Sequence, residues 1–175
     1  MKQLVITAVG PDRPGLVDEV SGYLLAQGAN LADSRMVNLR GRFALILLVE
    51  VEDDKAAAIA EEAAKAGEKI GLRVTVSYEE DDPAVQSGGL SFQLKTFAMD
   101  QPGIVHRITH LLHEHHVNIE ELQTRLEPGS YTGTPQFSMQ MCITIPGDLS
   151  ITQLRAELAG LCESLNCNLE IEPAD

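Results

Sequence analysis

The segment GPDRPGLVDEVSGYLLAQGANL, residues 10–31, has a second copy in the same chain. It aligns without gaps with AMDQPGIVHRITHLLHEHHVNI, residues 98–119, which lies 88 positions further on. Both copies contain a D-x-P-G tetrapeptide, apolar residues at helical spacing, and an asparagine 18 residues after the aspartate. The identical positions are Asp12/Asp100, Pro14/Pro102, Gly15/Gly103, Val17/Val105, Leu24/Leu112 and Asn30/Asn118. This agreement indicates that one structural unit occurs twice.

The elements expected around each copy follow the same order. Alternating or continuous apolar runs predict strands, and apolar residues three and four apart predict helices. In the first half we expect a strand at 2–9, a helix at 14–27, strands at 30–40 and 43–51, a helix at 53–69 and a strand at 72–78. In the second half we expect a strand at 90–99, a helix at 102–116, strands at 117–126 and 136–145, a helix at 150–165 and a strand at 167–172.

Two β-α-β-β-α-β units predict an α+β chain of two ferredoxin-like sandwiches, each an antiparallel sheet with two helices on one face. The predicted domains are residues 1–79 and 90–175. The acidic, small-residue segment at 80–89 is the predicted linker between them.

The D-x-P-G loop has a structural and a functional interpretation. In the structural one, Asp12 caps the helix, Pro14 begins its first turn, Gly15 allows a close approach to the neighbouring strand, and Gly28 ends the helix. In the functional one, the free N–H groups of a helix start attract a carboxylate. Asp and Asn oxygens beside them accept hydrogen bonds from an ammonium group. An α-amino acid carries both groups, whereas the aspartate disfavours a phosphate dianion.

The strand, D-x-P-G loop, helix and following asparagine resemble the ACT domain, a regulatory module of amino-acid metabolism. Both halves match, and two such domains in a chain this short resemble the glycine cleavage system transcriptional repressor family. That resemblance implies side-by-side pairing of ACT domains, with ligand sites at the seam. The implied first site comprises Gly10, Pro11, Asp12, Arg13, Pro14, Gly15 and Leu16, facing Asn30 and Leu31. The implied second site comprises Met99, Asp100, Gln101, Pro102, Gly103 and Ile104, facing Val117, Asn118 and Ile119.

The same resemblance implies a non-catalytic regulator that senses a small amino acid, with glycine as the candidate. It would act on a protein partner, a DNA-binding activator, and form a homodimer. We expect no cofactor. Because Arg13 is replaced by Gln101, we expect the two sites to differ in charge. Two alternatives stay open: a detached regulatory part, or relative, of an amino-acid- or folate-metabolising enzyme, and a ligand-free dimerisation module.

The composition argues against two classes of binding partner. The chain has 175 residues, a formal net charge of −13 and no tryptophan, so direct binding to nucleic acid or to an anionic membrane is not expected. No signal peptide is visible, and the odd set of three cysteines suits a reducing cytoplasm. We therefore expect a cytoplasmic protein.

Other chemistry-bearing residues have plainer interpretations. His106, His110 and His113 share one helix face without a completing ligand set, so a solvated face is favoured over a metal site. Cys162 and Cys167 are expected in the core. The segment 128–135, PGSYTGTP, lacks the lysine of a phosphate loop and is expected to be a hairpin tip.

Overall fold

The structure is a computed structural model that describes residues 1–78, 88–128 and 134–174. It contains two compact units, one on either side of residues 79–87. Most of the predicted linker and part of the predicted hairpin tip lie outside the described residues. Gly89, the last residue of the predicted linker, is the first residue of a strand.

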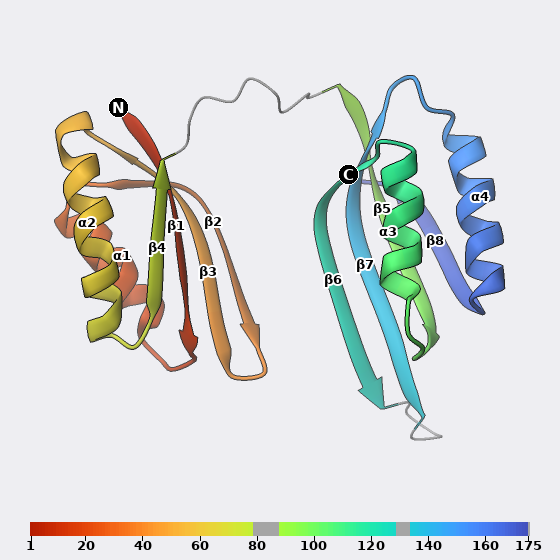
Figure 1. Ribbon diagram of the computed structural model, residues 1–175, viewed down its shortest axis with the longest axis horizontal. Coiled ribbons are helices and arrows are strands. Elements are labelled where there is room, and N and C mark those ends of the chain that lie inside the picture. The colour runs from red at the N-terminus through yellow and green to blue at the C-terminus, as the bar shows by residue number, and fades with distance from the viewer. Residues whose placement is uncertain (79–87, 129–133, 175) are drawn as a thin grey trace. The chain divides into compact units, whose positions relative to one another are not determined.

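Each domain has the predicted β-α-β-β-α-β order (Figure 1). The first consists of β1 (Lys2–Pro11), α1 (Leu16–Ala26), β2 (Asn30–Leu39), β3 (Arg42–Val51), α2 (Asp53–Lys69) and β4 (Arg73–Tyr78). The second consists of β5 (Gly89–Met99), α3 (Ile104–Glu114), β6 (Asn118–Pro128), β7 (Pro135–Pro146), α4 (Ile151–Ser164) and β8 (Cys167–Pro173). The predicted boundaries agree with these to within about two residues.

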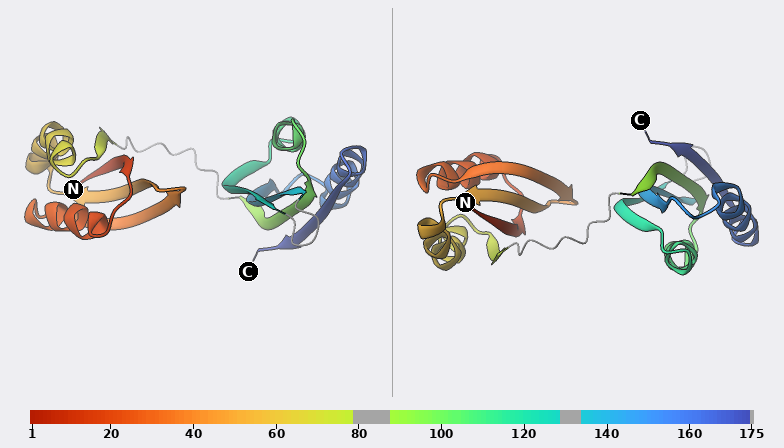
Figure 2. Two further views of the ribbon diagram at one scale, coloured as in Figure 1. Left: turned by 90° about the horizontal axis from the view of Figure 1, so that it is seen from below. Right: turned by 90° about the horizontal axis from the view of Figure 1, so that it is seen from above.

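Both sheets have four strands, in the orders β2-β3-β1-β4 and β6-β7-β5-β8, and the paired strands are antiparallel. In each domain the two helices cover one face of the sheet (Figure 2). Alternate side chains of the central strands, such as Leu45 and Leu47 of β3, are buried beneath the helices. The fold is therefore the predicted pair of ferredoxin-like sandwiches.

The repeat extends to backbone detail. Helices α1 and α3 begin and end 88 residues apart. The register of the first edge strand shifts between Leu31 and Asp33, and that of β6 shifts between Ile119 and Glu121, again 88 residues later. Each shift inserts one extra residue and exchanges the faces of the strand.

Helix α2 has the predicted bounds. Its N-cap is Glu52, and Asp53 is the first helical residue. Asp53 and Asp54 in the first turn and Lys69 in the last have the charges that the helix dipole favours. The many alanines have the highest helix propensity, so this segment forms a helix of 17 residues with small side chains on its inner face.

The first helix of each domain ends in a left-handed residue. Gly28 has φ 70° after α1, and His116 has φ 54° after α3. The next amide closes the turn in both domains: Ala29 N–H donates to Leu24 O at 3.0 Å, and Val117 N–H donates to Leu112 O at 2.9 Å. Gly28 therefore ends the helix as predicted, whereas histidine at the same point carries a steric penalty from its Cβ.

This difference predicts opposite responses to substitution. Gly28→Ala should destabilise the first domain by about 1 kcal/mol, and His116→Gly should stabilise the second by a similar amount. Urea unfolding followed by the amide signals of each domain measures both changes. Gly22→Ala, inside α1 with no atom within 4 Å of the added Cβ, is the control and should be stabilising. Equal effects at Gly22 and Gly28 would contradict this explanation.

Candidate functional site

The loops that join the first strand to the first helix, residues 10–16 and 99–104, have the same backbone form. Gly15 and Gly103 are the N-cap residues, with φ 92° and 96°. This left-handed conformation is easily accessible only to glycine, which is why the D-x-P-G motif ends in it. The predicted close approach of Gly15 to a strand is wrong, because an added Cβ there would meet only the Glu19 and Arg13 side chains within 4 Å. Gly10 is the crowded glycine of this loop, and its added Cβ would lie 2.5 Å from Gly71 O in the turn between α2 and β4.

The prediction that Asp12 caps the helix is wrong. The helix begins at Leu16, too far along the chain for Asp12 to be its N-cap, and Pro14 precedes the cap instead of beginning the first turn. No side chain among the described residues caps α1 or α3. The first N–H groups of each helix, which have no acceptor within the helix, therefore face the loop uncapped.

Asp12 is instead fixed to the β2–β3 hairpin. Its N–H donates to Gly41 O at 2.9 Å, and its carboxylate accepts from Asn38 Nδ2 at 2.5 Å. Asn38 Oδ1 in turn accepts from Gly41 N–H at 3.1 Å. A carboxylate has about four acceptor positions, so this contact leaves capacity for another donor.

The second loop is attached differently. Asp100 N–H donates to Pro135 O at 3.2 Å, which is the counterpart of the Asp12 backbone contact. Leu126 stands at the position of Asn38, so the side-chain amide that binds Asp12 has no equivalent there. The two aspartates therefore share a backbone position but differ in surroundings.

Arg13 and Gln101 make the same contact in spite of their different charge. Arg13 Nη2 donates to Ile70 O at 3.2 Å, and Gln101 Nε2 donates to Leu165 O. Ile70 and Leu165 are the C-cap residues of α2 and α4. Each side chain therefore ties the loop to the end of the second helix, where carbonyl groups lack donor partners within the helix.

Arg13 also forms a two-pronged ion pair with Glu19 of α1. Nη1 lies 2.5 Å from Oε1, and Nη2 lies 2.9 Å from Oε2. The hydrogen bond from Arg13 lowers the pKa of Glu19 below its ordinary value, and Glu19 raises that of Arg13. The expected charge difference between the loops is thus largely neutralised, because Glu19 occupies the guanidinium. Sequence reasoning missed Glu19, although an acid in the first turn beside a basic loop residue was a usable signal.

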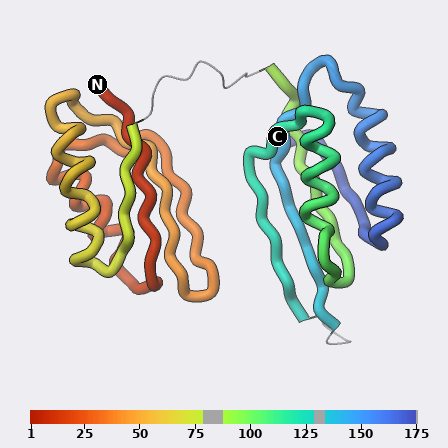
Figure 3. Tube along the Cα trace, in the orientation of Figure 1, coloured from red at the N-terminus to blue at the C-terminus, as the bar shows by residue number. Residues whose placement is uncertain are grey.

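The structure does not bring Asn30 to the first loop within the domain. Pairing through β3 aligns Asn30 with Glu50 and Gln3, whereas Gly10 aligns with Phe43 and Asn38. The start of β2 and the β1–α1 loop therefore lie at opposite ends of one sheet, as the chain trace shows (Figure 3). The second domain repeats this arrangement, and there Asn118 Nδ2 donates to Glu120 at 2.6 Å.

Several predicted site residues have side chains that belong to the core, so they offer a ligand only their backbone groups. Leu16, Ile104 and Val117 are buried in the two cores, and Ile119 packs against the second. Leu31 remains exposed. Gly10 and Pro11 belong to the end of β1, and Met99 ends β5. Pro14 and Pro102 precede the left-handed glycines in the turn.

The histidine and cysteine side chains named in the sequence analysis make their contacts outside these loops. His106 and His110 stack with ring centroids 5.8 Å apart, and His115 bonds Glu157 of α4 at 2.6 Å. Cys162 and Cys167 are buried as predicted, and burial raises the pKa of Cys162 to about 11. Across residues 1–78, 88–128 and 134–174 there is no cluster of three or more metal-ligating side chains, and no helix there is long and apolar enough to span a membrane.

Comparison with known proteins agrees with this architecture. A family model described as the ACT domain matches residues 2–77. The chain is 28% identical over 163 residues to the glycine cleavage system transcriptional repressor of Escherichia coli (strain K12), covering 93% of this chain and 85% of that protein. It is 38% identical over 82 residues to a UPF0237 protein of Methanopyrus kandleri, covering 46% of this chain and 91% of that protein. A crystal structure of an unknown protein from Galdieria sulphuraria superposes with a TM-score of 0.86 at 26% identity, covering 99% of each chain.

The Arg13–Glu19 pair predicts a pH-dependent contribution to stability. Because the folded-state pKa of Glu19 is lowered, the contribution is present above the ordinary value of 4.5 and is lost as the pH falls through the folded-state value. A double-mutant cycle with Arg13→Gln and Glu19→Gln should therefore show coupling at neutral pH and none in acid. Urea unfolding of the first domain measures it.

Salt provides the control for this cycle, because both side chains are exposed and roughly 1 M salt screens such pairs. Arg13→Gln alone should keep the loop attached to Ile70 O, as Gln101 does in the second domain. Coupling that persists unchanged in acid would contradict the ion-pair explanation.

Proposed function

We propose that this chain, whose first domain matches the ACT domain family over residues 2–77, is a non-catalytic regulatory protein that senses a small amino acid and acts on a protein partner. The observation that carries the proposal is the pair of uncapped helix starts, at α1 and α3, each preceded by an aspartate in the same loop geometry. Such a helix start attracts a carboxylate, and the aspartate attracts an ammonium group. Similarity to a transcriptional repressor over 93% of the chain supports the regulatory class and glycine as the first ligand to test.

We expect the second loop to bind more tightly than the first. The first turn of α1 contains Asp18 and Glu19, whereas that of α3 contains no acidic residue. Asp18, unlike Glu19, which is paired with Arg13, competes electrostatically with a ligand carboxylate there. Asp12 also already binds the Asn38 amide.

The asparagines enter the proposed sites only through a second ACT domain. β2 and β6 are edge strands, which readily pair with another strand. Antiparallel pairing of two such strands would bring the Asn30 end of one to the Asn38 end of the other, beside Asp12. This geometry supports ligand sites that are completed by domain pairing, and it accounts for the separation of the predicted residues within one domain.

The first domain has a surface that fits contact with a protein partner. On the sheet face opposite its helices, Val37, Leu39 and Ile46 are exposed by 54%, 67% and 46%. The corresponding residues of the second domain are Arg125, Glu127 and Gln140. Exposed apolar groups of this kind mark protein contacts, so the same observation favours the second candidate, a ligand-free association module. The described residues offer nothing in favour of the enzyme-related alternative, and we do not propose it.

Calorimetric titration of the whole protein with the twenty amino acids, glycine first, tests the proposal. We expect one or a few small amino acids to bind. Asp100→Ala should weaken binding by about tenfold or more, and Asp12→Ala should have a smaller effect, because each removes a charge-assisted contact. Asn30→Ala and Asn118→Ala should weaken it only if the sites are completed by domain pairing.

Asp148→Ala, at an exposed position away from both loops, is the matched control and should leave affinity unchanged. Absence of binding by every amino acid would overturn the sensor proposal. Concentration-dependent association by light scattering without ligand binding would instead favour the association module.

A further inference from the structure

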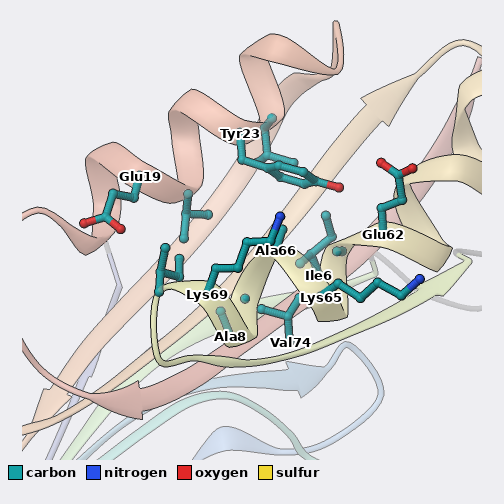
Figure 4. A pocket seen from close by; sticks show the side chains of 14 residues that line it. Ile6, Ala8, Glu19, Tyr23, Glu62, Lys65, Ala66, Lys69 and Val74 are labelled. Atoms are coloured by element: carbon teal, nitrogen blue, oxygen red, sulfur yellow. The ribbon is translucent and has the colours of Figure 1, made fainter.

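A pocket of about 500 Å³ lies in the first domain, between α1 and α2 on the helix-covered face of the sheet (Figure 4). Its floor is apolar, a tyrosine forms part of its wall, and its mouth carries several charged side chains. The floor is formed by Ile6, Ala8, Val20, Leu24 and Val74. This volume and lining are in the range of pockets that hold small organic ligands.

The pocket exists because the inner face of α2 carries small side chains. Ala63 and Ala66 line it, and Leu158 and Leu161 occupy the corresponding positions of α4. The correspondence is fixed by the left-handed residues that follow the two helices, Gly71 and Asn166, 95 positions apart. In the second domain Leu158 is buried and Leu161 packs against the core, so these larger side chains take up the equivalent space.

Gly67 sets the position of α2. A Cβ at this residue would lie 2.3 Å from Val74 Cγ2 and 2.9 Å from Leu72 O. The glycine therefore lets the helix lie close against β4, and the space remains on the side that faces α1. Cys162 replaces it in α4.

Tyr23 provides an unsatisfied polar group in the wall of the pocket. Its hydroxyl is buried and has no hydrogen-bond partner among the described residues. Burial, and secondarily the charge of Glu62, raises the pKa of this phenol, so it stays protonated and available as a donor. In the second domain the corresponding residue is Leu111, which packs against the core.

The charges at the mouth favour an anion. Glu19 is already paired with Arg13, which leaves Glu62, Lys65 and Lys69. Figure 4 shows the Tyr23 ring projecting from α1 towards α2, from which these three side chains extend. Two ammonium groups against one carboxylate make the mouth locally positive in a chain of net charge −13.

We propose that this interhelical pocket binds a small carboxylic acid with an apolar body. The body occupies the floor beneath the two helices, where it displaces water from apolar surface. The carboxylate accepts hydrogen bonds from the Tyr23 hydroxyl and the Lys69 ammonium group. The second domain, with leucines at the matched positions, lacks this site. The proposal concerns different residues from the Asp12 and Asp100 loops and does not depend on them.

Hexanoate is the probe for the experiment. NMR titration of the whole protein, with alanine methyl groups and Tyr23 observed, should show millimolar or tighter binding with shifts at Ala63, Ala66 and Tyr23. Hexanamide and hexylamine should bind about tenfold more weakly, because they lack the carboxylate. Tyr23→Phe and Lys69→Gln should each weaken hexanoate binding by about tenfold.

Ala66→Leu tests the shape of the site, because it installs the side chain found in α4. It should abolish hexanoate binding in a protein whose amide spectrum shows an intact fold. Ala57→Leu, at an exposed position of the same helix outside the pocket, should leave binding unchanged. Asp12→Ala should also have no effect, which separates this site from the proposed amino-acid sites.

Three outcomes would overturn the proposal. They are the absence of hexanoate binding to the unmodified protein, undiminished binding in folded Ala66→Leu, and equal or tighter binding of hexylamine. Loss of amino-acid binding with retention of hexanoate binding would overturn the proposed function and leave this site standing.

Discussion

In both domains the chain passes from its first strand to its first helix through a glycine with φ near 90°, and the rest of the domain depends on this turn. Gly15 and Gly103 reverse the chain so that the helix lies back across the sheet. Any residue with a Cβ would be strained there. The same turn leaves the first helix N–H groups uncapped and places the preceding side chains, Arg13 or Gln101, against the end of the second helix. A single backbone constraint thus connects the fold to the proposed ligand loops.

The two domains have diverged around this common frame. Their strand-to-helix loops, the bounds of α1 and α3, and the edge-strand bulges are matched in position. The side chains packed on the frame differ. The first domain has an alanine-rich second helix and exposed Val37, Leu39 and Ile46 on its outer sheet face. The second has a leucine-filled helix layer, with Arg125, Glu127 and Gln140 at the corresponding outer positions. Backbone geometry limits the loops to a few sequences, whereas many side chains are compatible with the two faces of a sheet. The two domains therefore offer different surfaces for ligands and partners.

The charge of the first loop also depends on a neighbouring side chain. From the sequence alone, the positive charge of Arg13 would be assigned to a ligand site. In the structure Glu19 neutralises this charge. The hydrogen bond to Ile70 O needs only a donor, which is why glutamine can replace arginine at the equivalent position of the second domain. Charge at a loop position therefore does not by itself indicate charge available to a ligand.

The sequence alone determined the repeat, the order of the elements, the ferredoxin-like fold and the burial of Cys162 and Cys167, because helical and strand periodicities and turn residues are local signals. It assigned Asp12 to the wrong role, since the extra residues of the turn moved the cap to Gly15. Only the tertiary structure decided that Asn30 lies at the far end of the sheet from Asp12, that Arg13 reaches Ile70 across 57 residues of chain, and that a pocket opens between α1 and α2. These relations depend on strand register and on the packing of distant segments, which no local pattern encodes.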